Sequence, residues 1–546
     1  MNEENQKLAL SRRSFIKAGA AGTAVAALSG VAARAMASDE LPFDREHDIV
    51  VVGGGGSGLP TALFSRWLGN DVVILEKAGS PGGSAAKAAF WYWVPNNKPM
   101  RDAGIVDEKA DYMRYVARLT RPHSYDASLP KLGLSDWEYE MCEAIYESAS
   151  PAAELLAERD ALPYRHCPDV PDYFAELSED KAKKGRVLVP KEARPSMSDG
   201  GRVAIRTLTA AAKRDGVQIR TGERVVKVIL NGAGEAIGVE VETEEGARQR
   251  VKARKAVIFA TGGFTHDPEL RRNFLNAPVY GGCAALTNEG DFIRISSELG
   301  VQLRNMNYAW SCPILLEKAL AKDGSMSGIF TMNGDSMLMV NKYGKRVVNE
   351  KTVYNELVPT FFQWDGDKAE YPNLVMFSIW DQRAQDYCSS DEYGSPIVPK
   401  GGNDRHVVKG ETLEDLAKNI AERLDKHAAD IGGMKLSADF TLNLKATLKR
   451  FNELAKTGKD LDFHRGELVI QGVFTGPVKP DRTGNLTMYP LAAKGPYYAA
   501  LITGGNLDTK GGPKTNSVGQ VLNNANAPIP GLYGVGNCVA SASRRA

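Results

Sequence analysis

Residues 48–58 constrain the fold of this chain more than any other segment. An apolar run, Ile49 to Val52, leads into four consecutive glycines, Gly53 to Gly56, which are followed by Ser57 and Gly58. This order is typical of a buried strand that turns sharply into a helix, whose first free N–H groups then face an anion. The pattern predicts that the pyrophosphate of a dinucleotide binds at this turn.

Three of the glycines have separate roles in such a turn. Gly53 permits the tight bend, Gly55 lets the backbone approach the pyrophosphate, and Gly58 lets the helix pack closely on the strand. The next predicted strand, residues 71–76, ends in Glu76, about twenty residues downstream, where a carboxylate can accept hydrogen bonds from ribose hydroxyls. Strand, turn, helix and acid in this order predict a Rossmann-like α/β domain, rather than a glycine turn of another doubly wound fold.

The first 37 residues have the features of a targeting segment. A twin-arginine motif at residues 11–17 precedes a stretch rich in Ala and Gly, and Ala35-Met36-Ala37 is typical of a cleavage site. Residues 18–33 fall short of the roughly twenty strongly apolar residues that a bilayer span requires, although an uncleaved anchor is the alternative. We therefore predict twin-arginine export to the periplasm or the outer face of the cytoplasmic membrane, with no stable membrane span in the mature chain.

Charge and cysteine content argue against several classes of protein. Lys and Arg number 68 and Asp and Glu number 67, so the chain has no excess of one charge that would attract nucleic acid. The six cysteines form no C-x-x-C pair and no haem attachment motif, and the histidines show no metal-ligand spacing. We expect neither a nucleic-acid partner nor a bound metal.

Periodicity along the chain predicts an interrupted domain. Alternating apolar residues at 217–230 and 238–243 predict a β-meander beside the nucleotide site, before a buried strand at 255–260. After residue 300 the pattern changes to mixed strands and amphipathic helices, including residues 412–427 and 442–456. The earlier pattern returns near the C-terminus. The predicted division is a nucleotide-binding domain in two parts, residues 46–300 and 496–546, around an inserted α+β domain, residues 301–495.

Further motifs follow the glycine turn in a fixed order. They are Glu76-Lys77, Pro81-Gly-Gly-Ser84, Ala260-Thr-Gly-Gly-Phe264, Asn288-Glu-Gly-Asp291, Gly344-Lys-Arg-Val-Val-Asn-Glu350, Gly511-Gly512 and Gly531-Leu-Tyr-Gly-Val-Gly-Asn537. Together they resemble the FAD-dependent flavoprotein family of fumarate reductase, succinate dehydrogenase and 3-ketosteroid Δ1-dehydrogenase. The resemblance covers nearly all of residues 46–543 and implies that the inserted domain caps the substrate.

The resemblance also implies a set of FAD contacts. Glu76 would hold the ribose, Ser84 and residues 260–262 would line the pyrophosphate, Val225 would pair with adenine, and Gly536-Asn537 would approach the flavin. Covalent members carry a histidine after the Gly-Gly pair, and this chain has none there, so the resemblance implies non-covalent FAD. The full set of implied residues is Gly53, Gly55, Gly56, Ser57, Gly58, Glu76, Lys77, Gly82, Gly83, Ser84, Val225, Ala260, Thr261, Gly262, Asp291, Gly536 and Asn537.

Two positions separate the branches of this family on the substrate side. Fumarate reductases place an arginine and a histidine where this chain has Tyr354 and Leu507-Asp508, and a dicarboxylate needs such cations. The carboxylate of Asp508 would instead repel a dicarboxylate. Tyr354, in Asn349-Glu-Lys-Thr-Val-Tyr354, instead resembles the tyrosine of ketosteroid dehydrogenases. That tyrosine accepts the proton from the carbon α to the ketone while hydride leaves the β carbon for flavin N5.

A phenol with an ordinary pKa near 10 serves as a base only where neighbouring donors stabilise the phenolate. We predict Tyr125 as the second tyrosine that does so; an amphipathic residue at a domain seam is the alternative for this position. The aromatic run Phe90-Trp-Tyr-Trp93 is expected to pack against the flavin, to wall the substrate cleft, or to belong to the core.

The C-terminus departs from the ketosteroid branch. There the Gly-Asn segment continues into a Tyr-x-x-x-Gly motif that binds the ketone, whereas this sequence ends at Ser541-Ala-Ser-Arg-Arg-Ala546. The expectation is either a shortened sequence or a protein without that ketone clamp.

The predicted function is FAD-dependent hydride transfer to or from a carbon–carbon bond conjugated to a carbonyl. The partners would be a small-molecule enone or ketone and a separate electron donor or acceptor. One alternative is a fumarate-reductase-like respiratory reductase of an activated alkene, and another is a flavin-binding protein without catalysis. A plain NAD dehydrogenase is disfavoured, since the Ala260-Thr-Gly-Gly263 and Gly-Asn motifs have no role in that fold.

Overall fold

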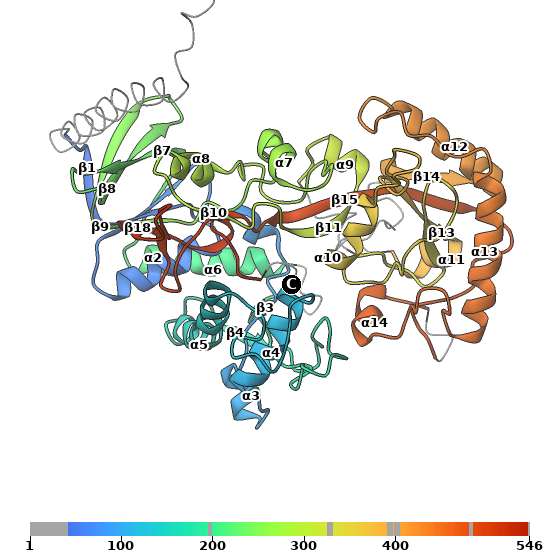
Figure 1. Ribbon diagram of the computed structural model, residues 1–546, viewed down its shortest axis with the longest axis horizontal. Coiled ribbons are helices and arrows are strands. Elements are labelled where there is room, and N and C mark those ends of the chain that lie inside the picture. The colour runs from blue at the N-terminus through green and yellow to red at the C-terminus, as the bar shows by residue number, and fades with distance from the viewer. Residues whose placement is uncertain are drawn as a thin grey trace, which may run out of the picture.

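The computed structural model of the protein describes residues 42–194, 199–324, 331–389, 397, 404–479 and 484–543. The predicted twin-arginine segment, residues 1–37, lies outside these described residues. In Figure 1 one sheet with its helices lies on the left, a second on the right, and a smaller unit below the centre. None of the helices in the described ranges is long and apolar enough to span a bilayer.

The left-hand body contains a sheet of eight described strands. Strand β1 pairs in parallel with both β2 and β9, so the carboxyl ends of these strands meet at one edge. The strands are β17 (Gln520–Leu522), β18 (Pro528–Gly534), β9 (Arg248–Phe259), β1 (Arg45–Val52), β2 (Val72–Glu76) and β6 (Gln218–Thr221) in spatial order, with β7 (Glu223–Leu230) and β8 (Ala236–Thr243) attached beyond β9. The glycine turn follows β1 at the shared carboxyl edge.

Both faces of this sheet are buried, which explains the unbroken apolar sequence of β1. Val51 packs against α2 (Gly58–Trp67) and α6 (Gly200–Arg214) on one face. Val50 and Val52 face β7, β8 and α8 (Asp291–Ser297) on the other. The predicted meander is present, because β7, β8 and β9 pair antiparallel in succession.

The right-hand body is built on an antiparallel sheet. Its strands are β11 (Ala309–Leu315), β15 (Tyr497–Thr509), β13 (Met376–Asp381) and β12 (Met337–Val340) in spatial order, with β14 (Val407–Gly410) also paired to β15. Helices α12 (Leu413–Lys426) and α13 (Phe440–Thr457) pack on the sheet through one large apolar cluster. They confirm the helices predicted at residues 412–427 and 442–456.

Strand β15 differs from the predicted division of the chain. The prediction assigned residues 496–546 to the nucleotide-binding domain, but β15 forms its hydrogen bonds with β11, β13 and β14 of the second sheet. The chain rejoins the first sheet only at β17 and β18. Apolar periodicity identifies a buried strand, but its sheet depends on long-range partners that periodicity does not encode.

The third unit lies below the two bodies in Figure 1. It contains the short sheet β3 (Tyr92–Trp93), β5 (Val187–Pro190) and β4 (Tyr164–His166), with helices α3 (Lys98–Asp102), α4 (Lys109–Thr120) and α5 (Asp136–Glu158). The remaining elements are η2 (Gly83–Lys87), α7 (Pro268–Phe274), β10 (Leu303–Arg304), α9 (Leu316–Leu320), α10 (Tyr354–Leu357), η3 (Val358–Phe362), α11 (Gln382–Tyr387), η4 (Asp404–His406), α14 (Val469–Thr475), β16 (Gly512–Pro513) and η5 (Gly536–Cys538).

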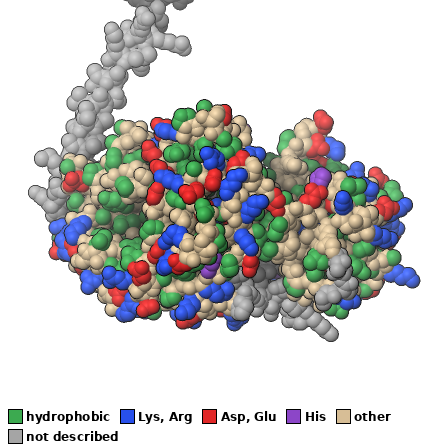
Figure 2. Space-filling model, turned by 90° about the horizontal axis from the view of Figure 1, so that it is seen from below, with side chains coloured by type: hydrophobic (Ala, Val, Ile, Leu, Met, Phe, Trp, Pro, Cys, Tyr) green, Lys and Arg blue, Asp and Glu red, His purple; other side chains and the backbone are tan. Residues whose placement is uncertain are grey.

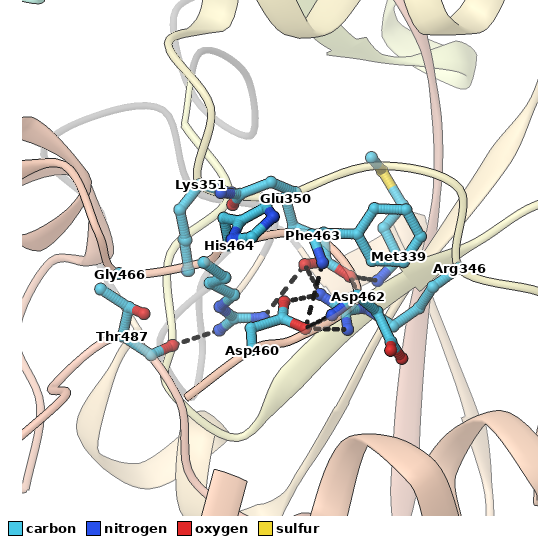
Figure 3. Close-up of polar contacts among 12 residues, drawn as sticks. Met339, Arg346, Glu350, Lys351, Asp460, Asp462, Phe463, His464, Gly466 and Thr487 are labelled. Atoms are coloured by element: carbon cyan, nitrogen blue, oxygen red, sulfur yellow. Dashed lines mark hydrogen bonds and ion pairs between the residues drawn. The ribbon is translucent and has the colours of Figure 1, made fainter. Parts of the chain in front are cut away.

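A buried ionic network lies in the right-hand body (Figure 3). Glu350 accepts two hydrogen bonds from Arg346, at 2.7 and 2.9 Å, and one from Arg465 at 3.2 Å. Arg346 also pairs with Asp460 at 2.8 Å. Burial by itself raises the pKa of Glu350, but the charges and hydrogen bonds of the two arginines outweigh it and lower the pKa from 4.5 to about 2.

We expect Glu350→Gln to destabilise the fold by about 3–5 kcal/mol at neutral pH, because it leaves two buried guanidinium groups undercompensated. A lowered native pKa stabilises the fold above the unfolded pKa, and this contribution is lost as the pH falls below 4.5 toward 2. Urea unfolding at pH 7 and at about pH 4 measures both effects. The variant should lose less stability on acidification than the wild type, and the exposed Glu422→Gln serves as the control. An unchanged unfolding midpoint at pH 7 would contradict this role.

Candidate active site

A cavity of about 1090 Å³ lies where the three units meet. Its walls come from the carboxyl edge of the first sheet, from the second sheet and α14, and from the loop that carries Val170 and Tyr173. This volume slightly exceeds the usual range for small-molecule pockets, so it can hold an extended ligand together with a second molecule.

The glycine turn forms one end of the cavity. All the residues predicted to contact FAD line it, except Gly58. Gly58 lies beneath the turn at the start of α2, where a Cβ atom would come within 1.9 Å of the carbonyl oxygen of Gly53. A Cβ at Gly55 would meet only Gly82 O at 3.8 Å, and one at Gly83 would meet nothing within 4 Å. Side chains at these two positions would therefore occupy the space that a pyrophosphate needs.

Glu76 is held rigidly at the end of β2. Its carboxylate accepts hydrogen bonds from the N–H groups of Gly54, at 2.7 Å, and Ala78, at 2.8 Å. Each oxygen keeps a further lone pair for a ligand hydroxyl. This geometry suits the recognition of a ribose beside the turn.

The charged residues at this end are paired with one another. Asp291, the first residue of α8, binds Lys77 at 2.6 Å and Arg224 at 2.5 Å. Val225 follows Arg224 in β7 and lines the cavity. The residues predicted to surround the adenosine therefore come together from β2, β7 and α8.

The hydroxyl of Ser84 is positioned as a donor toward the cavity. Its oxygen accepts from Ala285 N–H at 2.9 Å and from Asn288 Nδ2 at 3.2 Å. The hydroxyl proton is then left to donate, which suits an anionic ligand. Across the cavity, residues 260–262 turn sharply at Gly262, whose φ is 72°.

Asp508 joins β15 to the nucleotide-binding body. Its carboxylate accepts from the Gly263 N–H at 3.2 Å, from Asn288 Nδ2 at 2.7 Å and from Asn537 Nδ2 at 3.3 Å. Burial raises the pKa of Asp508, against these donors. The residue that the sequence suggested would repel a dicarboxylate thus lies in the cavity wall with its oxygens bound by three segments. Asn537 follows Gly536, where a Cβ would meet Ser57 Oγ at 2.4 Å.

The opposite end of the cavity is aromatic and carries a pair of phenols. Tyr354, the first residue of α10, and Tyr173 have their hydroxyl oxygens 3.0 Å apart. The ring of Phe474 lies 5.5 Å from that of Tyr173 and 6.1 Å from that of Tyr354, between centroids. Trp310 and Leu507 also line the cavity.

Tyr125, the predicted second tyrosine, lies elsewhere. It is not among the residues that line the cavity, and its ring packs beside Tyr112, Leu132 and Leu134 in the third unit. Tyr173 takes the position beside Tyr354 instead. Of the aromatic run, Phe90, Trp91 and Tyr92 line the cavity, whereas Trp93 packs against Tyr112.

Comparison with known proteins agrees with this geometry. The family model described as "FAD binding domain" matches residues 48–546. The chain belongs to this family. FAD is accordingly the cofactor, and the family is one of FAD-dependent oxidoreductases.

Among curated relatives of this FAD binding domain protein, 4-oxocyclohexanecarboxylate 2-dehydrogenase of Sinomonas cyclohexanicum is 28% identical over 91% of this chain and 88% of its own length. The 3-oxosteroid 1-dehydrogenase of Mycobacterium tuberculosis is 28% identical over 90% of this chain and 93% of its own. The crystal structure of 3-ketosteroid Δ1-dehydrogenase from Sterolibacterium denitrificans has a TM-score of 0.75 at 21% identity, covering 92% of this chain and 95% of that one. The last comparison supports the fold alone.

The flavoprotein holds Tyr173 in place through the residue before it. Asp172 accepts a hydrogen bond from Trp93 Nε1 at 2.7 Å and pairs with the fully buried Arg186. Arg186 also binds Asp107 and Asp180, each through a short ion pair. The loop over the cavity is therefore fixed by charges from four parts of the third unit, and no local sequence motif marks Tyr173.

Burial raises the pKa of Tyr173 to about 12, although its hydrogen bond with Tyr354 works in the opposite direction. Tyr173 thus stays protonated in the physiological range and can donate to the oxygen of Tyr354. Such a donor favours the phenolate of Tyr354 over the phenol.

We expect Tyr173→Phe to shift the alkaline rise of kcat/KM to higher pH by about one to two units, since the phenolate of Tyr354 loses a charge-assisted hydrogen bond. The measurement is a pH profile of ketone turnover in the FAD-loaded protein. Tyr497→Phe, which removes a phenol hydroxyl bonded to Ala492 O outside the cavity, is the control. A profile that stays in place or moves to lower pH would exclude this role for Tyr173.

Proposed function

We propose that this flavoprotein transfers hydride between FAD and a carbon–carbon bond next to a ketone, with Tyr354 exchanging the proton at the α carbon. The observation that carries the proposal is the pair of hydroxyls of Tyr354 and Tyr173, 3.0 Å apart at the aromatic end of the cavity whose other end is the dinucleotide turn. A base at one end and a hydride acceptor along the same cavity is the arrangement that α,β-dehydrogenation needs.

The charged residues around the cavity favour a substrate that is uncharged where it reacts. Among the described residues that line it, the cations are Lys77, Lys87 and Arg224. Lys77 and Arg224 bind Asp291, and Lys87 donates to the carbonyls of Cys283 and Ala284 at 3.0 and 3.1 Å. Each cation therefore already has a partner, which supports a neutral ketone over a dicarboxylate such as fumarate.

The names of the relatives support the same substrate class. One is named for a steroid ketone and another for an oxocyclohexane carboxylate, so both names describe a ketone in a six-membered ring. We propose a cyclic ketone, with an apolar body that contacts Phe474, Leu507 and Trp310.

FAD and the two tyrosines have separate roles in the proposed reaction. Bound FAD supplies a two-electron acceptor or donor for hydride. Tyr354 takes the proton from the α carbon, Tyr173 donates to the phenolate oxygen, and the aromatic walls exclude bulk water from the reacting atoms. In the opposite direction, Tyr354 delivers the proton to the α carbon.

Purified holoprotein should reduce dichlorophenolindophenol when supplied with androst-4-ene-3,17-dione or 4-oxocyclohexanecarboxylate. A separate assay with reduced viologen and an enone tests the reverse direction, which is the alternative of a respiratory alkene reductase. A protein that binds FAD but turns over no member of either panel would refute the proposal and favour a flavin-binding protein without catalysis.

We also propose export by the twin-arginine pathway and an electron partner outside the cytoplasm. The support is the motif at residues 11–17 and the need to load FAD before transport. Cations and anions are interspersed over the face in Figure 2, which supports the prediction that the protein does not bind nucleic acid. Cell fractionation of the wild type and an Arg12→Lys/Arg13→Lys variant tests the location; a wild-type protein retained in the cytoplasm would refute it.

A further inference from the structure

Asn333 is a buried polar side chain in the cavity wall. The proposed hydride and proton transfer does not involve it. It is 6% exposed and lines the cavity together with Thr331, Tyr354 and Phe474. An amide in an otherwise aromatic wall is costly to bury unless both of its ends find partners. Its hydrogen bonds therefore show what it can offer to a ligand.

One end of the Asn333 amide is occupied. Thr331 Oγ1 donates to Asn333 Oδ1 at 2.7 Å, which fixes the orientation of the amide. Within the described part of the chain, Nδ2 makes no hydrogen bond. The group presented to the cavity is therefore a hydrogen-bond donor.

The segment around Asn333 is held on both sides. Lys351 Nζ donates to Met332 O, and Gly334 N–H donates to Thr475 O at 2.9 Å. Arg465, the buried partner of Glu350, donates to Gly334 O at 3.4 Å. Arg465 belongs to the ionic network around Glu350 (Figure 3), and Lys351 follows Glu350 in the sequence. This network therefore anchors the loop that carries the amide. A donor fixed in this way needs no rearrangement when a ligand binds.

Asn333 and Tyr354 lie against the same short segment at the end of α14. A Cβ atom at Gly476, whose φ is 74°, would come within 2.9 Å of Asn333 Nδ2. Two residues earlier, the ring of Phe474 contacts that of Tyr354. The amide and the ring of Tyr354 therefore border the same short segment, residues 474–476, and both residues line the cavity.

We propose that Asn333 Nδ2 donates a hydrogen bond to the ketone oxygen of the substrate. As the C–H bond at the α carbon breaks and its proton passes to the oxygen of Tyr354, the electron pair of that bond shifts toward the carbonyl. Negative charge then develops on the ketone oxygen, where a fixed donor stabilises the transition state more than the ground state. This role rests on the proposed function.

Asn333→Asp keeps the shape of the side chain and replaces the donor with an acceptor. We expect it to lower kcat/KM by about 10²–10³, as does the loss of one oxyanion donor in other enzymes. Ketone affinity, read as the change in flavin absorbance on adding androst-4-ene-3,17-dione to the oxidised holoprotein, should fall by about threefold to tenfold. Asn419→Asp on α12, far from the cavity, is the matched control.

A second pair of variants tests the orientation of the amide. Thr331→Val removes the donor that fixes Oδ1, so kcat/KM should fall by about tenfold, whereas Thr331→Ser keeps the hydroxyl and should restore it. If the wild type turns over ketones and Asn333→Asp matches it in both readouts, the assignment of Asn333 is wrong while the proposed function stands. If the wild type binds the ketone in an Asn333-dependent way but does not turn it over, the proposed function fails and the binding role stands. A wild type that binds no ketone overturns both.

Discussion

Replacing Tyr354 with phenylalanine is expected to abolish ketone turnover while leaving the flavoprotein folded and yellow. The variant keeps the ring that packs against Phe474 and removes the hydroxyl that lies 3.0 Å from Tyr173. A positioned general base contributes about 10²–10⁴ to the rate, and Tyr173 cannot replace it, because burial raises the pKa of Tyr173 to about 12 and keeps its hydroxyl protonated. We therefore expect kcat to fall by at least about 10³.

Steady-state assays with dichlorophenolindophenol measure this loss, and the flavin absorbance spectrum reports whether FAD remains bound. Tyr125→Phe is the informative control, since Tyr125 lies outside the cavity and should keep near-wild-type activity. If Tyr125→Phe loses turnover and Tyr354→Phe keeps it, the assignment of the base is wrong.

The dinucleotide site could be predicted because its determinants are contiguous in sequence. The turn at residues 53–58 and the acid Glu76 belong to one strand-turn-helix-strand unit, in which each glycine has a local steric reason. The structure adds contacts that no motif shows, such as the hydrogen bonds that hold the Glu76 carboxylate to Gly54 and Ala78. Local geometry therefore accounts for the predicted position of the cofactor.

The substrate end could be predicted only in part. Tyr354 follows a recognisable motif, whereas Tyr173 reaches it from 181 positions away in the sequence. Its location depends on the buried charges around Arg186, which join residues 107, 172 and 180. Residue type alone suggests Tyr125, but a tyrosine at a seam between units gives the same sequence signal whether or not it faces a cavity.

The role of Asp508 could not be predicted from its charge alone. From the sequence alone, its charge is expected to act on the substrate, because a carboxylate repels a dicarboxylate. In the structure, donors from Gly263, Asn288 and Asn537 bind its oxygens and tie β15 to the nucleotide-binding body. The sequence identifies a charge, but two of the donors that bind it lie 245 and 220 positions away in the sequence.

Gly58→Ala is expected to yield a protein that no longer retains FAD. A Cβ atom at this position would lie 1.9 Å from the carbonyl oxygen of Gly53 and 3.1 Å from its carbon, and both are backbone atoms that cannot rotate away. The turn must then open, at a cost of about 1–3 kcal/mol for overpacking and more for a backbone clash. Helix preference for Ala over Gly opposes this by only about 1 kcal/mol. The clash therefore dominates, and FAD affinity should fall by at least about 100-fold.

The ratio of flavin to protein absorbance after purification, followed by titration of the apoprotein with FAD, measures the effect of Gly58→Ala. Gly79→Ala, in the exposed bend between β2 and η2, is the matched control, because a Cβ there meets nothing within 4 Å. The control separates the steric effect from the general entropic effect of replacing glycine, which both variants share. If Gly58→Ala retains FAD as well as Gly79→Ala does, helix α2 can move away from β1 without disturbing the turn. The close contact between Gly58 and Gly53 would then not be what shapes the pyrophosphate site.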